Sequence, residues 1–255
     1  MSRKTYLYEM TRPEIEQALA DGYDTAVVNF GSTEQHGLHL PMGTDSIWGE
    51  VLAERVTRSL GKALQLPGVR IGLSEHHMAF AGSLTVAPET FTLIVRDICR
   101  SVAHHGFREI VLIPTHGGNF RPLGEAIARI QPELPDLHLI GWTDLAELTH
   151  ILWSVAARHG IGSEVAGAHA GANETSIILH LRPDLVNMDI AEPGFIGDHL
   201  GQAEKIIGGG FHKVTTNGVL GDPRLGKADM GAEYIAALTD AVIARVQSAR
   251  AGYGV

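Results

Sequence analysis

The chain has 255 residues, of which 44% are hydrophobic and 19% are charged, as in an ordinary soluble enzyme. Its formal net charge of −9, with no run of basic residues, argues against binding to nucleic acid. The single cysteine excludes an internal disulfide, and no apolar stretch is long enough to cross a membrane. Because the first ten residues lack the apolar core of a secretory signal, we expect a cytoplasmic protein.

Apolar runs of strand length alternate with helical patterns along the chain. The first helix follows Thr11, where Glu14 three residues later completes a capping box. We predict strands at residues 25–30, 69–73, 109–114 and 137–142. The helices predicted between and after them run to about residue 20, from Thr44 or Asp45 through Val56, and over residues 88–105, about 120–130, 174–181 and 231–249. Residues 208–210 are predicted to form a loop. This alternation predicts one domain (residues 1–255) of the α/β class, a three-layer α/β/α sandwich with a largely parallel sheet.

Two polar loops follow predicted strands, and open α/β sheets bind ligands at the carboxyl ends of their strands. The first loop carries Glu34, His36, His39 and Asp45. Carboxylates beside imidazoles suit Zn²⁺, Mn²⁺ or Fe²⁺, and Asp45 can bridge two cations through its two oxygens. A solvated loop with a capping aspartate is the alternative interpretation, but the four residues together favour a metal site.

The second loop begins at His116, and its Gly-Gly-Asn sequence allows the backbone to approach a ligand closely. Asn119 could orient His116 or cap the following helix. A third segment places His169 in a loop of small residues and Glu174 at a predicted helix start. His169 is therefore a candidate general acid or base, and Glu174 a candidate ligand or general base.

A fourth polar segment contains Glu75 and His76. Two interpretations stay open: these side chains line a substrate pocket, or they belong to a solvated loop.

We expect the thiol of Cys99 to be buried within its helix. The remaining histidines considered have no acidic partner at ligand spacing, and we expect them to be structural or on the surface. They are His104, His105, His138, His150, His159, His180, His199 and His212.

The order and spacing of these motifs resemble the creatininase family. The most specific stretch is residues 31–45, which read Gly-Ser-Thr-Glu-Gln-His-Gly-Leu-His-Leu-Pro-Met-Gly-Thr-Asp. Further matching stretches extend to residues 218–223, so the resemblance covers nearly the whole chain. The resemblance implies an α/β/α fold, a centre of two divalent metal ions and a homo-oligomer, often a hexamer.

The resemblance also implies that Glu34 and His116 hold one ion, that His36 holds the other and that Asp45 bridges them. Creatininase has His-Tyr-Glu-Asn where this chain has His-Gly-Gly-Asn, so Gly118 replaces a ligand carboxylate. We infer that Glu174 supplies the missing carboxylate. These departures favour relatives that act on formamides, lactams, cyclic ketones or peptides over creatinine itself.

We therefore expect a metal-dependent amidohydrolase that opens the C–N bond of a small cyclic amide or formamide with an activated water. The metal would be Zn²⁺, with Mn²⁺ or Fe²⁺ as alternatives. His169 would pass a proton to the leaving nitrogen, and Asn119 would support His116. Two alternatives stay open: hydrolysis of a cyclic ketone or a peptide at the same site, and a catalytically silent oligomeric binding protein.

Overall fold

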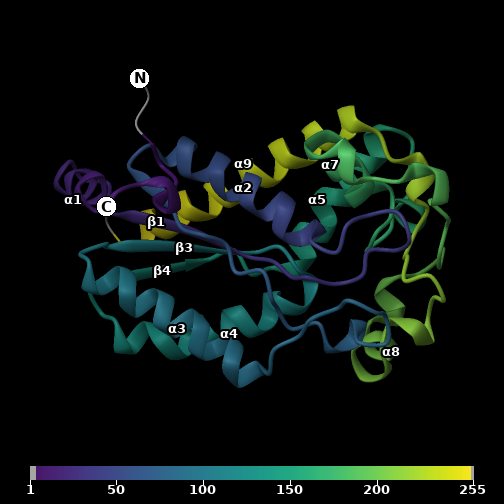
Figure 1. The fold of residues 1–255 in the computed structure, drawn as a ribbon, viewed down its shortest axis with the longest axis horizontal. Helices are drawn as coiled ribbons and strands as arrows, with labels where there is room; N and C mark the ends of the chain where they lie inside the picture. Colours follow the sequence, from purple (N-terminus) through teal and green to yellow (C-terminus); the bar gives the residue numbers. More distant parts are fainter. Residues whose placement is uncertain (1–3, 254–255) are drawn as a thin grey trace.

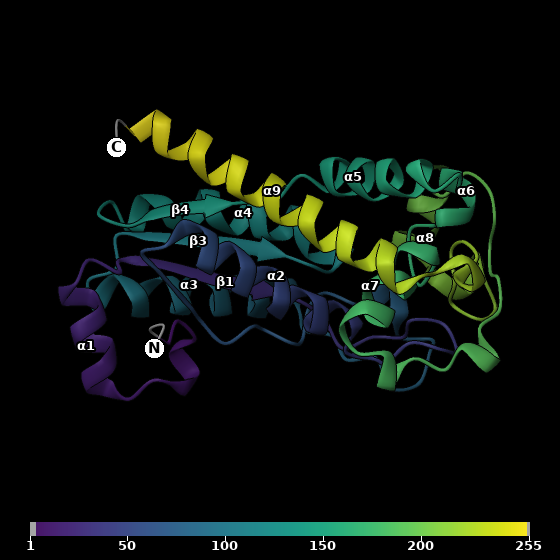
Figure 2. The ribbon, with the colours of Figure 1, turned by 90° about the horizontal axis from the view of Figure 1, so that it is seen from above.

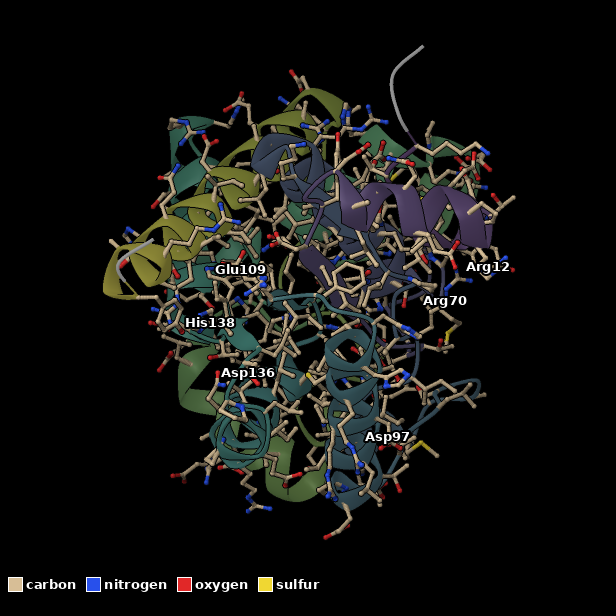
Figure 3. The ribbon with its side chains drawn as sticks, turned by 90° about the vertical axis from the view of Figure 1, so that its left-hand side faces the viewer. Arg12, Arg70, Asp97, Glu109, Asp136 and His138 are labelled. Carbon is tan, nitrogen blue, oxygen red and sulfur yellow. The ribbon has the colours of Figure 1, made fainter. Side chains whose placement is uncertain are left out.

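A parallel sheet lies at the centre of the computed structural model, which describes residues 4–253; residues 1–3 and 254–255 of the expected domain lie outside the described part. Within that part, the sheet has four strands in the order β2-β1-β3-β4. They are β1 (Thr25–Phe30), β2 (Ala63–Gln65), β3 (Glu109–Pro114) and β4 (His138–Gly141). Figure 3 looks at the end of the sheet where Glu109 and His138 begin their strands and pair with each other. The carboxyl ends of the parallel strands therefore meet at the opposite end of the sheet.

Helices cover both faces of the sheet (Figures 1 and 2). In residues 4–253 they are α1 (Arg12–Ala20), α2 (Thr44–Leu60), α3 (Pro88–His104), α4 (Phe120–Ile130), α5 (Leu145–Arg158), α6 (Ser163–Ala166), α7 (Ala172–Leu181), α8 (Ala203–Gly209) and α9 (Ala228–Tyr253). Helices α2 and α9 lie on one face, and α3 and α4 lie on the other. None of the described helices is both long and apolar enough to cross a membrane.

The central strands send alternate side chains into two separate hydrophobic cores. Val27 of β1 packs with α2 and α9, whereas its neighbours Ala26 and Val28 pack with α3 and α4. Every residue of β1 and β3 is buried. Because successive strand residues point to opposite faces, a strand covered on both faces is mostly apolar. The predicted three-layer α/β/α sandwich is thus confirmed.

The strand predicted at residues 69–73 is wrong. Only Val69 pairs with the sheet, through a single bridge to Phe30, and the edge strand is β2, which we did not predict. The chain leaves the sheet after Val69 because its next backbone groups bond elsewhere. The amide of Leu73 donates to Asn119 Oδ1 at 3.0 Å, and the amide of Ser74 donates to Thr85 Oγ1 at 3.0 Å. These bonds draw the segment toward the loops at the sheet end.

Other boundaries also differ from the prediction. Gly208 and Gly209 are not a loop but the last turn of α8, which ends where Gly210 adopts φ +91°. Helix α9 is longer than the predicted 231–249. Helix α5 was not predicted, although Asp144 caps it by accepting bonds from the amides of its first turn.

Candidate metal centre

The five predicted ligands come together at the carboxyl end of the sheet, from three different parts of the chain. Glu34 and His36 lie in the loop after β1, and Asp45 lies in the first turn of α2. His116 follows β3, and Glu174 lies in the first turn of α7. All are buried except Glu174, which is partly buried. A buried set of carboxylates and imidazoles requires charge compensation from each other or from a cation.

Two groups of potential ligand atoms share Asp45. In the first, His116 Nδ1 lies 3.0 Å from Glu34 Oε1 and 3.3 Å from Asp45 Oδ2. In the second, His36 Nε2 lies 3.2 Å from Asp45 Oδ1 and 3.8 Å from Glu174 Oε2. Within each group, the ligand atoms lie within 4.8 Å of one another. The two carboxylate oxygens of Asp45 therefore face two different histidines.

Backbone carbonyls fix which nitrogen of each histidine carries the hydrogen. His36 Nδ1 lies 3.1 Å from the Glu34 carbonyl, and His116 Nε2 lies 3.1 Å from the Leu73 carbonyl. A carbonyl only accepts, so these two nitrogens donate, and a neutral ring keeps its lone pair on the other nitrogen. In both rings that other nitrogen faces carboxylate oxygens. Lone pairs that face carboxylates repel them unless a proton or a metal ion lies between.

Several of these atoms have no hydrogen-bond partner although they are buried. They are Glu34 Oε2, His36 Nε2 and Asp45 Oδ2. Orphaned buried polar atoms are rare in folded proteins, and a cluster of them needs an explanation. Divalent cations bound by nitrogen and oxygen ligands would satisfy these atoms, so the donor set fits a metal.

The electrostatics of the group also favour positive charge. Burial alone would lower the pKa of His36, but the charges of Asp45 and Glu174 outweigh it and raise the pKa to about 10. Burial likewise opposes protonation of His116, but Glu34 and Asp45 raise its pKa well above the usual value. The negative field that holds a proton here would equally attract a metal ion.

The pKa values of the candidate ligands Asp45 and Glu174 shift in opposite directions. Burial raises the pKa of Asp45, but His36 and His116 outweigh burial and lower it. Burial is the largest influence on Glu174 and raises its pKa to about 7, with His36 opposing and Asp45 adding to the rise. Glu174 also accepts a hydrogen bond from the amide of Ala170, a residue that the loop holds at φ 52°. Without a cation, Asp45 is therefore the stronger acid of the two.

His169, the predicted general acid or base, lies beside this cluster. Its ring centroid is 4.3 Å from that of His36, and its Nε2 lies 2.8 Å from the Gln35 carbonyl. Nε2 therefore donates, which leaves the lone pair on Nδ1. Burial and the neighbouring His36 lower the pKa of His169 well below its usual value. A buried, neutral imidazole with a free lone pair can accept a proton, and Glu34, His36 and His169 also form a third group at ligand distances.

Asn119 supports His116 indirectly, through the backbone of Leu73. Its Nδ2 donates to the carbonyls of Phe30 and Gly31 at 3.0 Å, and its Oδ1 accepts from the Leu73 amide. The carbonyl of Leu73 in turn accepts from His116. The side chain does not cap α4 either. Asn119 thus joins the end of β1 to the segment that orients His116.

The remaining predicted residues take different places. His76 lines the pocket described below, and its pKa is lowered to about 4 by burial and then by His116. Glu75 is exposed and does not line that pocket. His39 is buried, and its Nε2 lies 2.8 Å from Thr175 Oγ1, so it ties the first loop to α7 beside Glu174. Burial, followed by His36, lowers the pKa of His39 to about 4.

Position 118 has no room for the carboxylate that creatininase carries there. A Cβ atom on Gly118 would lie 2.4 Å from the Leu73 carbonyl oxygen and 2.5 Å from His116 Nε2. The same carbonyl and nitrogen are the pair that orients His116. The loop is therefore built around a glycine, and position 118 supplies no carboxylate to the cluster.

A pocket of about 490 Å³ opens beside the cluster. Its lining is mainly apolar and includes Trp48, Leu152, Trp153, Ile177 and Phe211 as well as Glu34, Asp45, His116, His169 and Glu174. His199, expected to be structural or on the surface, is buried and also lines it. No lysine or arginine is among the described residues of its lining. Such a pocket, apolar with a few convergent polar groups, is typical of a ligand site.

Sequence analysis missed two buried residues at the centre. Gln35 lies between Glu34 and His36 in the sequence, and its side chain is buried. His77 is also buried, and its Nε2 lies 3.3 Å from Glu34 Oε1. Gln35 stands inside the most specific motif, and His77 is adjacent to a residue that we singled out. Glutamine is not a typical metal ligand, and His77 lies far along the chain from the Glu34 carboxylate that it faces, so only their positions in the fold reveal their roles.

Fold and site together define a three-layer α/β protein with a buried carboxylate–imidazole centre beside an apolar pocket. Residues 8–246 match the creatininase (creatinine amidohydrolase) family model, and the chain therefore belongs to the creatininase family. Its relatives are hydrolases, and the chain is accordingly a hydrolase of this family.

Individual relatives resemble the chain over most of its length. A mycofactocin precursor peptide peptidase from Mycobacterium ulcerans (strain Agy99) is 30% identical, and the match covers 89% of this chain and 86% of the relative. A creatinine amidohydrolase from Pseudomonas putida is 29% identical over 74% of this chain and 76% of its own. A solved structure described as creatininase Mn superposes with a TM-score of 0.77 at 24% identity, covering 96% of this chain and 98% of the other. This last likeness bears on the fold, which it confirms.

Proposed function

We propose that this protein is a metal-dependent amidohydrolase that cleaves the C–N bond of an uncharged small amide, such as a cyclic amide or a formamide. One observation carries the proposal. In their neutral forms, His36 and His116 each turn a lone pair toward the shared carboxylate of Asp45, while a backbone carbonyl fixes the hydrogen on the other ring nitrogen. This arrangement is the one that metal-ligating histidines adopt.

Two divalent ions account for the two groups that share Asp45. Glu34, Asp45 and His116 would hold one ion, and His36, Asp45 and Glu174 the other. Nitrogen and carboxylate ligands suit Zn²⁺, with Mn²⁺ or Fe²⁺ as alternatives. When bound, the ions would polarise the amide carbonyl and lower the pKa of a water molecule.

The protein's own residues would move the proton. His169 is neutral and keeps a lone pair on Nδ1, so it can take a proton from water and deliver it to the leaving nitrogen. The Gln35 carbonyl holds the ring in this tautomer throughout. The apolar pocket excludes water around the scissile amide, which strengthens each electrostatic interaction.

The pocket favours substrates without negative charge. The described residues of its lining include no lysine or arginine that could pair with a carboxylate or phosphate of the substrate. Aromatic and aliphatic side chains such as Trp153 and Phe211 would bury an apolar ring or side chain.

A short peptide is a second candidate substrate. A relative that is 30% identical is named a peptidase. The pocket volume of about 490 Å³ lies within the range of roughly 300–1,000 Å³ that accommodates drug-sized ligands. Since a peptide bond is an amide, the same water attack and proton transfer would serve it.

A substrate panel tests the reaction class. Zinc-loaded and manganese-loaded protein would be incubated with lactams, formamides, short neutral peptides and cyclic ketones, with products identified by mass spectrometry. We expect C–N cleavage of a neutral amide that Asp45→Ala abolishes. Cleavage confined to the ketones, or no turnover of any compound by protein carrying its ions, would contradict the amidohydrolase proposal.

The assembly of the chain is a further part of the proposal. Both hydrophobic cores flank the one sheet, which supports a single domain over residues 1–255. The family resemblance supports a homo-oligomer, often a hexamer, without fixing its size. Light scattering of the purified protein would give the mass of the assembly directly.

A further inference from the structure

Gln35 has an amide orientation that the structure fixes without ambiguity. Its side chain is buried, with 4% of the residue exposed. Oε1 accepts a hydrogen bond from the Gly37 amide at 2.9 Å, so Nε2 must be the atom on the other side. There Nε2 lies 3.2 Å from the carbonyl of Gly218 and 3.1 Å from His77 Nδ1. His169 Nε2 also lies 3.1 Å from Gln35 Nε2, but it donates to the Gln35 carbonyl and so cannot accept, which leaves the two amide hydrogens to Gly218 and His77.

This orientation determines the tautomer of His77. An amide NH₂ group only donates, so His77 Nδ1 must accept, and its hydrogen must be on Nε2. Nε2 lies 3.3 Å from Glu34 Oε1, and both side chains are 1% exposed. His77 therefore presents an N–H group to the carboxylate of Glu34.

His77 thus differs from the candidate ligands around it. His36 and His116 turn lone pairs toward carboxylates, as a metal-binding histidine must. His77 turns a hydrogen toward one. An Nε2 atom that carries a hydrogen cannot also bind a metal, so His77 holds Glu34 and is not itself a ligand.

We propose that Gln35 and His77 form a positioning pair, in which Gln35 sets the tautomer of His77 and His77 orients the Glu34 carboxylate for metal binding. The inference rests on the proposed metal site. Phe211 holds the imidazole ring from one side, since the two ring centroids are 4.2 Å apart with an interplanar angle of 30°. The contact with Phe211 sets the plane of the His77 ring, and the contacts of its two nitrogens with Gln35 and Glu34 set the direction in which each nitrogen points.

Nitrogen NMR reads the tautomer directly. Zinc-loaded protein labelled with ¹⁵N-histidine would give long-range nitrogen–proton correlations, and the His77 signals would be assigned by their absence in His77→Gln. We expect the pattern of a neutral ring protonated at Nε2, and a mixture of tautomers in Gln35→Leu. Protonation at Nδ1, or the shift of a metal-bound nitrogen at Nε2, would overturn the proposal.

Metal affinity tests the consequence for Glu34. His77→Leu removes the donor, and we expect the zinc affinity to fall roughly 10–100-fold, as for other residues that orient metal ligands. His77→Gln retains a donor that reaches Glu34, so its affinity should stay within about threefold of the wild type on the same scale. His150→Leu, an exposed histidine on α5, is the matched control and should not change the affinity.

The outcomes separate this inference from the proposed function. Equal zinc affinity of His77→Leu and the wild type would overturn the positioning role alone. Loss of one ion per chain in His77→Gln would make His77 a ligand and would also overturn it. A wild-type protein that binds no divalent ion would overturn the proposed metal site itself. If His77→Leu does not fold, the tautomer measurement on the wild type and Gln35→Leu still decides.

Discussion

Asp45 and His169 have roles that single substitutions can separate. Asp45 belongs both to the candidate ligand group that contains His116 and to the one that contains Glu174, so Asp45→Ala should lose bound metal and activity together. His169→Ala should keep its metal and lose mainly kcat, by roughly 10²–10⁴-fold, the usual contribution of a general acid or base. Elemental analysis and steady-state kinetics on both variants check this. Loss of metal from His169→Ala would instead assign His169 to the third ligand group.

Cys99 should be chemically inert in the folded protein. The thiol is buried in α3, and burial raises its pKa to about 12 from a usual value of 9.0. The raised pKa stabilises the fold below pH 9, and this contribution is lost as the pH rises toward 12. A colorimetric thiol reagent at pH 8 should not react with the native chain and should titrate one thiol in denaturant. Rapid reaction of the native protein would contradict the burial.

The sequence indicates the candidate ligand residues well and their orientation poorly. Glu34, His36 and Asp45 lie so close together in the chain that their pattern is visible without a fold. The Gln35–His77 pair is not visible, because its role depends on which side of an amide faces which nitrogen. Hydrogen-bond direction is a property of the folded arrangement and leaves no mark on residue spacing.

Helices α7 and α9 approach so closely that a glycine is required between them. A Cβ atom on Gly231 would lie 2.1 Å from the Ser176 carbonyl oxygen and 2.6 Å from the Cβ of His180. Gly231→Ala should force the helices apart and destabilise the fold by roughly 1–3 kcal/mol, as overpacking does. Because α7 carries Glu174, metal affinity should also fall. Denaturant unfolding and zinc titration measure both effects, and wild-type stability of this variant would contradict the packing.

Elements that are buried on both sides are the easiest to predict. β1 and β3 read as continuous apolar runs and form as expected. β2 has only three residues, too few for a pattern, and residues 69–73 have the composition of a strand but bond to Asn119 and Thr85. Tertiary hydrogen bonds thus decide the outcome where the local pattern is short.

The arrangement of the chain brings segments more than a hundred residues apart into one site. The loops after β1 and β3 and the start of α7 meet at the carboxyl end of the sheet, away from the end shown in Figure 3. The parallel α/β class predicts this edge for the site, which is why the first two loops could be placed in advance. The apolar pocket could not, because α5 and α8 contribute to it and neither was predicted.

Metal binding should contribute to the stability of the entire fold, because the ligands come from separate segments. An ion present at 100 times its dissociation constant adds about 2.7 kcal/mol. For a chain of this size, its removal by a chelator should lower Tm by roughly 5–10 °C. Thermal unfolding with and without chelator, followed by addition of zinc, measures this. A Tm that does not change would contradict metal ligands shared between the sheet loops and α7.

The most direct test of the metal centre is the metal content of protein purified without chelator, determined by elemental mass spectrometry. The two groups that share Asp45 predict about two ions of zinc, manganese or iron per chain. One ion per chain would remove Glu174 or Glu34 from the ligand set. No ion, even after incubation with zinc or manganese, would contradict the metal-dependent hydrolase and favour a catalytically silent member of the family.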